Sequence, residues 1–301
     1  MRVFIIAWCL GVMLSAGCGE KKAATANKHS PRKILVIGLI PEQNIFRQMD
    51  RYEPLARYLQ ARTGYKINLV VLPRYGNIID TFVSKGMDGA FFGSLTYTLA
   101  HAKLGVEVVA RPENLDGTST YYGLIFVRKD SGIKTAADMR GKRFVFVDKA
   151  TTAGYLLPLD YFHRNGIKDI HAFFKETYYA GTHEDVIYDV LNRKADIGAA
   201  KNTVFERLAK ADNKIGESLV ILQRSPEVPE NSLALRKDIG DEVKDKLKEA
   251  LLNMHNDPEG KTVLADFGAQ RFIRTTDADF GPVQRYAKEI HLDLSSYDYM
   301  N

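Results

Sequence analysis

The sequence predicts an α/β fold that is divided into two lobes. Short apolar runs, which are typical of buried strands, alternate with amphipathic segments, which are typical of helices, along most of the 301 residues. The alternation begins at residues 33–40 and starts again after the apolar run 121–128. Because strands that alternate with helices usually pair in parallel, we expect each lobe to hold a mostly parallel sheet covered by helices on both faces.

The first part of the pattern supplies the elements of lobe 1. The continuous apolar run Lys33–Ile40 predicts a buried strand. The helix predicted for Arg51–Thr63 has Leu55 and Leu59 on one face and ends at Gly64, a common helix terminator. Strands are then expected at residues 65–73, 88–92 and 106–111, and helices at 78–85 and 94–104.

The second part of the pattern enters another lobe and then returns. Strands are expected at residues 121–128, 143–147, 177–179, 196–200 and 219–223, with helices at 155–165 and 182–194. After a strand at 232–236, helices at 241–253 and 260–267 follow, and the end near Asp298 is expected to be frayed. Crossings near residues 122–127 and 224–232 would make a hinge beside a cleft. We therefore assign residues 33–126 and 229–301 to lobe 1, and residues 127–228 to lobe 2.

The first residues predict export from the cytoplasm. Arg2 precedes an apolar segment without acidic residues, and small residues lead to Cys18, as in a secretory signal. The apolar segment is short for a membrane span. The sequence Leu14–Cys18 resembles the lipobox of bacterial lipoproteins, in which cleavage precedes a cysteine that is diacylated on sulfur. This resemblance implies a signal peptide over residues 1–17, a lipid anchor on Cys18 at the periplasmic or extracytoplasmic face of a bacterial membrane, and a polar tether over residues 18–32.

The composition excludes several classes of protein. The only other cysteine, Cys9, lies in the signal, so a mature chain would contain no internal disulfide. A net charge of +5 without an arginine-rich stretch argues against a nucleic-acid partner but suits an anionic ligand. The sequence contains no nucleophile elbow, phosphate-binding loop or zinc-protease motif, and its 7 histidines do not have metal-ligand spacing. We therefore expect neither an enzyme nor a metal or cofactor site.

Three turns place small or hydroxyl residues where a strand ends and a helix begins. They lie at residues 92–97, 147–155 and 180–185, and they contain Ser94, the pair Thr151 and Thr152, and His183. Ligands of open α/β sheets bind at the carboxyl ends of strands, and free N–H groups at helix starts favour anions. The alternative is that these residues only cap helices, with Ser94 as a cap and Thr182 in a capping box. The turns themselves leave both interpretations open.

Five short motifs give the chain a resemblance to a known family. They are Leu72–Tyr75, Phe92–Ser94, Asp148–Gly154, Ala180–Glu184 and Ser225–Pro229. In this order and spacing they resemble the phosphonate/phosphite/phosphate-binding lipoproteins of ABC importers, over residues 34–272. The resemblance implies a two-lobe periplasmic-binding-protein type II fold, a small oxyanion ligand, an ABC permease as partner, and a monomer. A ligand-sensing subunit with the same fold is the first alternative, and an exported enzyme acting on phosphorylated compounds is a distant second.

The resemblance also implies roles for individual residues. In that family the turn usually has the sequence Asp-Pro-x-Ser-Thr-Ser-Gly, and its hydroxyls and N–H groups hold the oxyanion. Thr151 and Thr152 take the hydroxyl positions here, while Ala153 stands where serine is common and Lys149 replaces the usual proline. By the same resemblance, the side chain of His183 donates to the oxyanion.

Four further positions complete the expected site. The resemblance implies that Tyr75 closes the pocket and that Ser94 is a polar contact from lobe 1. Family members that bind aminoalkylphosphonates surround the ligand amine with carboxylates, and Thr203 and Asn231 align with those positions. Since both residues are neutral, we expect phosphate, phosphite or a simple alkylphosphonate as the ligand.

Overall fold

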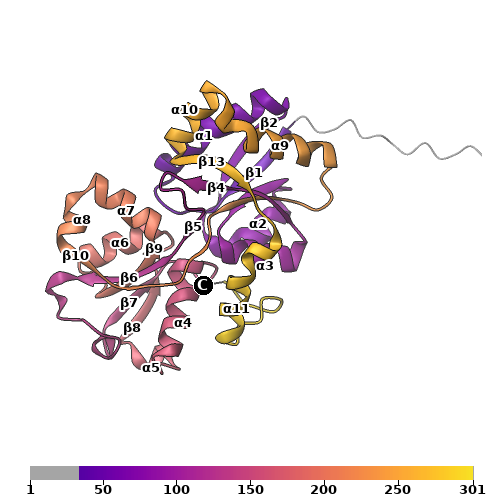
Figure 1. The fold of residues 1–301 in the computed structure, drawn as a ribbon. Helices are drawn as coiled ribbons and strands as arrows, with labels where there is room; N and C mark the ends of the chain where they lie inside the picture. The colour runs from indigo at the N-terminus through magenta and orange to yellow at the C-terminus, as the bar shows by residue number, and fades with distance from the viewer. Residues whose placement is uncertain (1–33, 301) are drawn as a thin grey trace, which may run out of the picture. The chain divides into compact units, whose positions relative to one another are not determined.

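The computed structural model describes residues 34–300, which form two β-sheets with helices packed against them (Figure 1). Both sheets belong to one compact unit, Lys33–Asn301. The predicted α/β fold with two lobes is confirmed, and we call the six-stranded sheet with its helices lobe 1 and the five-stranded sheet with its helices lobe 2. The expected signal peptide, tether and Cys18 lie outside the described residues. No helix within residues 34–300 is both long enough and apolar enough to cross a membrane.

Lobe 1 contains a mixed sheet with the strand order β13-β4-β12-β3-β1-β2. The strands are β1 (Ile34–Leu39), β2 (Lys66–Val71), β3 (Gly89–Phe92), β4 (Glu107–Asn114), β12 (Ser232–Leu235) and β13 (Ala269–Arg274). The central strand β1 pairs in parallel with β2 and β3, whereas β12 is antiparallel to β3 and β4, and β13 is antiparallel to β4.

Helices cover both faces of this sheet. One face packs against α1 (Ile45–Thr63), α9 (Asp241–Asn253) and α10 (Pro258–Phe267) through a cluster of buried side chains that includes Leu35, Leu55 and Leu247. The other face packs against α2 (Ile78–Ser84) and α3 (Ser94–Leu104). The alternation of side chains along each strand therefore supplies both faces with apolar contacts.

Lobe 2 is built in the same way around the order β10-β6-β9-β7-β8. Its strands are β6 (Gly123–Arg128), β7 (Arg143–Phe146), β8 (Glu176–Tyr179), β9 (Ile197–Lys201) and β10 (Leu219–Arg224). An aromatic cluster packs one face against α4 (Leu157–Arg164) and α5 (Ile170–Phe173). The other face packs against α6 (His183–Leu191), α7 (Asn202–Ala211) and α8 (Asn213–Ser218), in a cluster that continues into lobe 1.

The two chain crossings pair with each other. The short strands β5 (Thr120–Tyr121) and β11 (Val228–Pro229) are antiparallel, with Val228 opposite Tyr121. This ribbon joins the outgoing and the returning chain between the sheets, which is the arrangement expected of a hinge. After β13, the last helix, α11 (Gly281–Glu289), contacts α3 of lobe 1 and α4 of lobe 2.

Several expectations about the elements need correction. The sheets are mixed rather than mostly parallel, because strands next to the crossings, such as β6 and β12, run against their neighbours. The expected lobe boundary after residue 126 falls inside β6, all of which pairs in the second sheet. The expected strand 121–128 is interrupted at Tyr122. The helices α7, α8 and α11 and the strand β13 were not predicted from the sequence.

The ends of two expected segments also differ. The side chain of Ser94 does not cap α3, because its hydroxyl donates to the carbonyl of Pro229, 2.5 Å away. The C-terminal segment expected to be frayed makes specific contacts instead. The hydroxyl of Tyr297 donates to the carbonyl of Lys149 at 2.9 Å, and Tyr299 is buried.

The threonine turn begins with a π-helical turn, Thr152–Leu156, before α4. It requires glycine at position 154, where a Cβ atom would lie 2.4 Å from Cγ2 of Val147 and 2.9 Å from Oγ1 of Thr151. Because these neighbours leave no room for a methyl group, only glycine lets the turn approach the end of β7 closely.

We predict that Gly154→Ala lowers the free energy of unfolding by about 1–3 kcal/mol, since it forces a side chain into a filled space. Chemical unfolding followed by circular dichroism measures this change. Gly216→Ala in α8 is the matched control, because a Cβ atom there meets nothing within 4 Å, and it should be neutral or stabilising. Equal stability of Gly154→Ala and the unaltered protein would contradict the close packing of this turn.

Candidate functional site

A small enclosed cavity lies where the carboxyl ends of strands from both lobes meet. Its wall contains residues of lobe 1, of the crossings and of lobe 2: Ile40, Glu42, Tyr75, Gly93, Thr96, Tyr121, Ala150, Thr151, Thr152, Ala153, His183, Lys201 and Asn231. Its volume of about 10 Å³ is close to the smallest space that holds one water molecule. We call it the inner cavity. Five of the expected site residues, namely Tyr75, Thr151, Thr152, His183 and Asn231, are brought together in its wall.

The two threonines of the turn have different hydrogen bonds. The hydroxyl of Thr151 donates to the carbonyl of Asp148 at 2.7 Å, so its proton is used within the turn. The hydroxyl of Thr152 instead accepts the backbone N–H of Leu95 in lobe 1 at 2.8 Å. Thr152 therefore joins the starts of two helices that belong to different lobes. The first N–H groups of its own helix have no acceptor within that helix, which leaves donors at this edge of the cavity.

His183 presents a neutral imidazole. Its Nδ1 accepts the backbone N–H of Lys201 at 3.1 Å, so the ring proton of the neutral form resides on Nε2. Burial lowers the pKa of His183 to about 3 because removal from water disfavours the charged ring. The backbone N–H of His183 donates to the carbonyl of Glu42 across the two lobes at 3.1 Å. His183 is thus held in place by both lobes and acts as a neutral N–H donor around neutral pH.

Tyr75 supplies a second neutral donor from lobe 1. Its ring meets the His183 ring edge to face, with 6.0 Å between the centroids. The Tyr75 hydroxyl is buried and has no hydrogen-bond partner among residues 34–300. Burial raises its pKa well above the ordinary value, so the hydroxyl keeps its proton. A buried donor without a partner is costly, and this hydroxyl belongs to a residue in the cavity wall, where an anionic oxygen would satisfy it.

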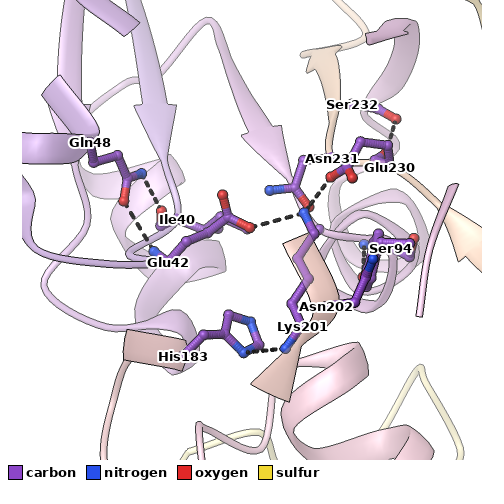
Figure 2. A network of polar contacts seen from close by, with 12 residues as sticks. Ile40, Glu42, Gln48, Ser94, His183, Lys201, Asn202, Glu230, Asn231 and Ser232 are labelled. Atoms are coloured by element: carbon purple, nitrogen blue, oxygen red, sulfur yellow. Dashed lines mark hydrogen bonds and ion pairs between the residues drawn. The ribbon is translucent and has the colours of Figure 1, made fainter. Parts of the chain in front are cut away.

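Three charged side chains form a buried ion cluster beside these donors (Figure 2). The Nζ atom of Lys201, at the end of β9, lies 3.0 Å from Oε1 of Glu42 in lobe 1 and forms a closer ion pair with Glu230 between β11 and β12. The side chains of Lys201, Glu42 and Glu230 are only 4%, 5% and 6% exposed. The amide oxygen of Asn231 accepts a further bond from Lys201 Nζ at 3.2 Å.

Glu42 and Lys201 are ionised throughout the physiological pH range. Burial alone would raise the pKa of Glu42, but nearby cations, Lys201 first among them, outweigh burial and hold it at about 2. Burial alone would lower the pKa of Lys201, but Glu230 and Glu42 outweigh it and raise the value above the ordinary one. Gln48 fixes the backbone of the loop before α1, because its side chain bonds the N–H of Glu42 and the carbonyl of Ile40. This loop places Glu42 opposite Lys201.

The two remaining expected residues lie outside the inner cavity wall. Ser94 is fully buried and bonds to Pro229, so it contributes to the joint between α3 and the returning crossing. Thr203, in α7, lines a larger outer cavity of about 600 Å³ that shares Glu42, Lys201 and Asn231 with the inner cavity and also contains Glu230. Thr203 and Asn231 are neutral, but the carboxylates of Glu42 and Glu230 bond to the same Lys201 Nζ atom as the Asn231 amide oxygen, so acidic side chains from other positions lie beside Asn231.

The expected site residues did not include Lys201, Glu42 or Glu230. A signal was available for two of them, because Lys201 ends the apolar strand β9 and Glu42 follows the apolar strand β1 closely. Ligands of open α/β sheets bind at the carboxyl ends of strands, and this rule, which pointed to the three turns, also applies to the ends of β1 and β9. Residues 34–300 contain no group of three or more histidine, cysteine or acidic side chains that could hold a metal ion.

We predict that the buried His183 makes stability depend on pH. An unfolded histidine gains a proton below about pH 6.5, whereas His183 in the folded protein gains one only near pH 3. Lowering the pH from 6.5 therefore favours the unfolded state, by roughly 1.4 kcal/mol per pH unit. Protonation of Glu42 also favours the unfolded state, but only below pH 4.5, the ordinary pKa of a glutamate. Between pH 6.5 and pH 4.5 the change in stability therefore reports His183 and not Glu42.

Urea unfolding across this range measures the slope. His183→Gln, which retains an acceptor for the Lys201 N–H group, should lose less stability as the pH falls than the unaltered protein does. His171→Gln is the control, because His171 is exposed, and it should keep the original slope. Parallel pH profiles for His183→Gln and the unaltered protein would refute a buried neutral His183.

Comparison with known proteins places the chain in a family. The sequence profile described as ABC transporter, phosphonate, periplasmic substrate-binding protein matches residues 37–280. The phosphonates-binding periplasmic protein of Escherichia coli is 27% identical, over 87% of this chain and 78% of that protein. The phosphate-import protein PhnD of Mycolicibacterium smegmatis is 26% identical, over 94% of both chains.

A solved structure agrees with the sequence comparison. The crystal structure of a binding protein component of an ABC phosphonate transporter from Pseudomonas aeruginosa superposes with a TM-score of 0.80, is 26% identical, and covers 86% of each chain. Because the family profile spans most of the chain and the fold of this relative agrees over the same extent, the chain belongs to the periplasmic substrate-binding proteins of phosphonate ABC transporters.

Proposed function

We propose that this protein captures a small phosphorus oxyanion, namely phosphate, phosphite or a simple alkylphosphonate, and passes it to the permease of an ABC importer. The observation that supports this most strongly is the set of neutral donors that both lobes direct to one cavity: the Tyr75 hydroxyl, the Nε2–H of His183, and the threonine turn. Hydrogen bonds from neutral donors to a charged oxygen are stronger than bonds between neutral groups. The names of the relatives in E. coli and M. smegmatis support the same class of ligand.

The same groups are suited to binding rather than to catalysis. A general acid or base works best when its pKa lies near the pH at which the protein operates. The pKa of His183 is about 3 and that of Tyr75 is raised well above its ordinary value, so neither exchanges a proton near neutral pH. We infer that these residues hold an anion without transforming it, and that the protein is not an enzyme.

Binding requires the lobes to separate and close again. The inner cavity, at about 10 Å³, has room for about one water molecule, which is less than a tetrahedral oxyanion needs. The paired crossings β5 and β11 offer a hinge for opening. An anion that contacts Tyr75 of lobe 1 and His183 of lobe 2 together would favour the closed arrangement, because only that arrangement provides both sets of donors.

We further propose that the protein acts as a monomer attached by a lipid to the periplasmic or extracytoplasmic face of a bacterial membrane. The lipobox-like sequence that ends at Cys18 and the polar stretch over residues 18–32 support a lipid anchor with a tether. An anchored binding protein would remain close to its permease in the membrane. Stable attachment by acyl chains requires two such chains or one chain with a second signal, which diacylation of one cysteine would provide.

Our prediction for ligand binding concerns Thr152. Thr152→Val retains the shape of the side chain but removes the hydroxyl, and it should weaken binding of methylphosphonate, phosphite or phosphate by roughly 1.5–3 kcal/mol, the contribution of a hydrogen bond to a charged group. Isothermal titration calorimetry measures this loss. Thr152→Ser keeps the hydroxyl and should bind within a few-fold of the original affinity. If Thr152→Val binds as tightly as the unaltered protein, the turn has only a capping role.

Our prediction for the anchor concerns Cys18. Cys18→Ser should remain uncleaved and should not incorporate labelled palmitate, because serine cannot form the thioether of a lipoprotein. Cys9→Ser is the matched control, since it alters the only other cysteine and should be labelled and processed normally. Palmitate incorporation into Cys18→Ser at the original level would exclude this anchor.

A further inference from the structure

Lys201 is held in the way that proteins hold a bound ammonium ion. Its Nζ atom contacts carboxylate oxygens of Glu42 and Glu230 and the amide oxygen of Asn231. The Tyr121 ring provides an aromatic face 4.3 Å from the same nitrogen, a favourable position for a cation. Two carboxylates and an amide oxygen (Figure 2), together with this aromatic ring, form a receptor for one primary ammonium group.

This receptor lies at the inner cavity, and it contains a hydrogen-bond acceptor to which Lys201 does not donate. Glu42, Tyr121 and Asn231 also line the inner cavity, so a ligand bound there would touch the receptor with its substituent. Oε2 of Glu230 is buried and has no hydrogen-bond partner within the described part of the chain. Lys201 therefore leaves one acceptor unsatisfied, and a ligand ammonium group, which has three N–H bonds, would satisfy the receptor more fully only if it took the place of Lys201.

The charges make Lys201 difficult to remove without replacement. Taking away one member of a buried, hydrogen-bonded ion pair leaves the other charges without compensation. Without the Lys201 ammonium, two carboxylates with side chains only 5% and 6% exposed would lie next to each other. Any small cation that fits the space would then bind favourably.

We propose that Glu42, Glu230, Asn231 and Tyr121 form a cation subsite that Lys201 fills from within the protein, so that Lys201 excludes phosphonates bearing an ammonium group. The proposal rests on the proposed function, because it concerns the substituent of the same phosphorus ligand. In the unaltered protein the ammonium of such a ligand competes with a tethered lysine. When the lysine ammonium is absent, the ligand ammonium takes its place and pairs with both carboxylates.

Two nearly isosteric ligands test the selectivity. Propylphosphonate and 2-aminoethylphosphonate differ by a methyl group in place of an ammonium group, and calorimetry gives the ratio of their dissociation constants. The unaltered protein should prefer propylphosphonate. Lys201→Met, which retains the packing of the lysine stem, should shift the ratio toward 2-aminoethylphosphonate by at least about tenfold, since a buried charge pair is restored. An unchanged ratio in folded Lys201→Met would overturn the proposal.

Control variants separate the subsite from general electrostatics and from loss of the fold. Lys210→Met removes the charge of an exposed lysine in α7 that lines the outer cavity, and it should leave the ratio unchanged. A shift as large as that of Lys201→Met would overturn the proposal. If Lys201→Met does not fold, the double variant Lys201→Met, Glu230→Gln replaces it, because it removes one of the two negative charges and retains Glu42. The proposal requires the double variant to show the same shift in the ratio of dissociation constants.

A second measurement does not depend on any phosphorus ligand. Methylammonium chloride should raise the melting temperature of Lys201→Met, or of the double variant, above the value in sodium chloride at the same concentration, and it should not do so for the unaltered protein. Equal melting temperatures in the two salts would count against the cation subsite. If methylammonium stabilises the variant but no phosphorus oxyanion binds the unaltered protein, the subsite stands and the proposed function fails.

Discussion

The buried ion cluster of Glu42, Lys201 and Glu230 is the constraint on which the arrangement of the two lobes depends. Each charge is nearly inaccessible to water, and such charges are tolerated only when they are paired. Glu42 comes from lobe 1 and Lys201 from lobe 2, so the pairing exists only while the lobes are together. The backbone bond from His183 to Glu42 and the bond from Leu95 to Thr152 lie beside it and also join the lobes.

This cluster need not resist opening strongly. When the lobes separate, Glu42 and Lys201 lose each other but regain water, and hydration offsets much of the lost attraction. Removing one partner by mutation has a different effect, because the remaining charge stays buried when the lobes close. The cluster therefore aligns the lobes in the arrangement seen here, while the proposed anion, by contacting both lobes, would supply an additional preference for closure.

The sequence predicted the elements better than their pairing. The helix expected at 241–253 matches α9, and the run beginning at Lys33 matches β1 closely. Strand direction could not be predicted, because a strand buried on both faces has the same apolar composition whether its neighbours are parallel or antiparallel. The helix α7 was missed although Val204, Phe205 and Leu208 are buried on one side of it. Its first turn follows Lys201 without a side-chain cap, so the usual start signal is absent.

The candidate site was predictable where residues follow one another in the chain, as in the turn with Thr151 and Thr152. It was not predictable where distant residues meet. Lys201 is separated from Glu42 by 159 positions and from Glu230 by 29. A single lysine or glutamate in a sequence is normally exposed, and although Lys201 and Glu42 lie at strand ends, nothing in the sequence marks these three residues as partners of one another. Only the folding of both crossings between the sheets brings them together.

The backbone and the side chain of Lys201 contact different parts of the proposed site. Its backbone N–H bonds to Nδ1 of His183 and thereby leaves Nε2 as the ring nitrogen that carries the proton. Its side chain holds the carboxylates that face the ligand substituent. A change of the Lys201 side chain leaves the backbone N–H in place, so the His183 ring keeps its orientation and its proton. Recognition of the phosphorus group by neutral donors and selection of its substituent by charge are therefore separable, although both depend on the last residue of β9.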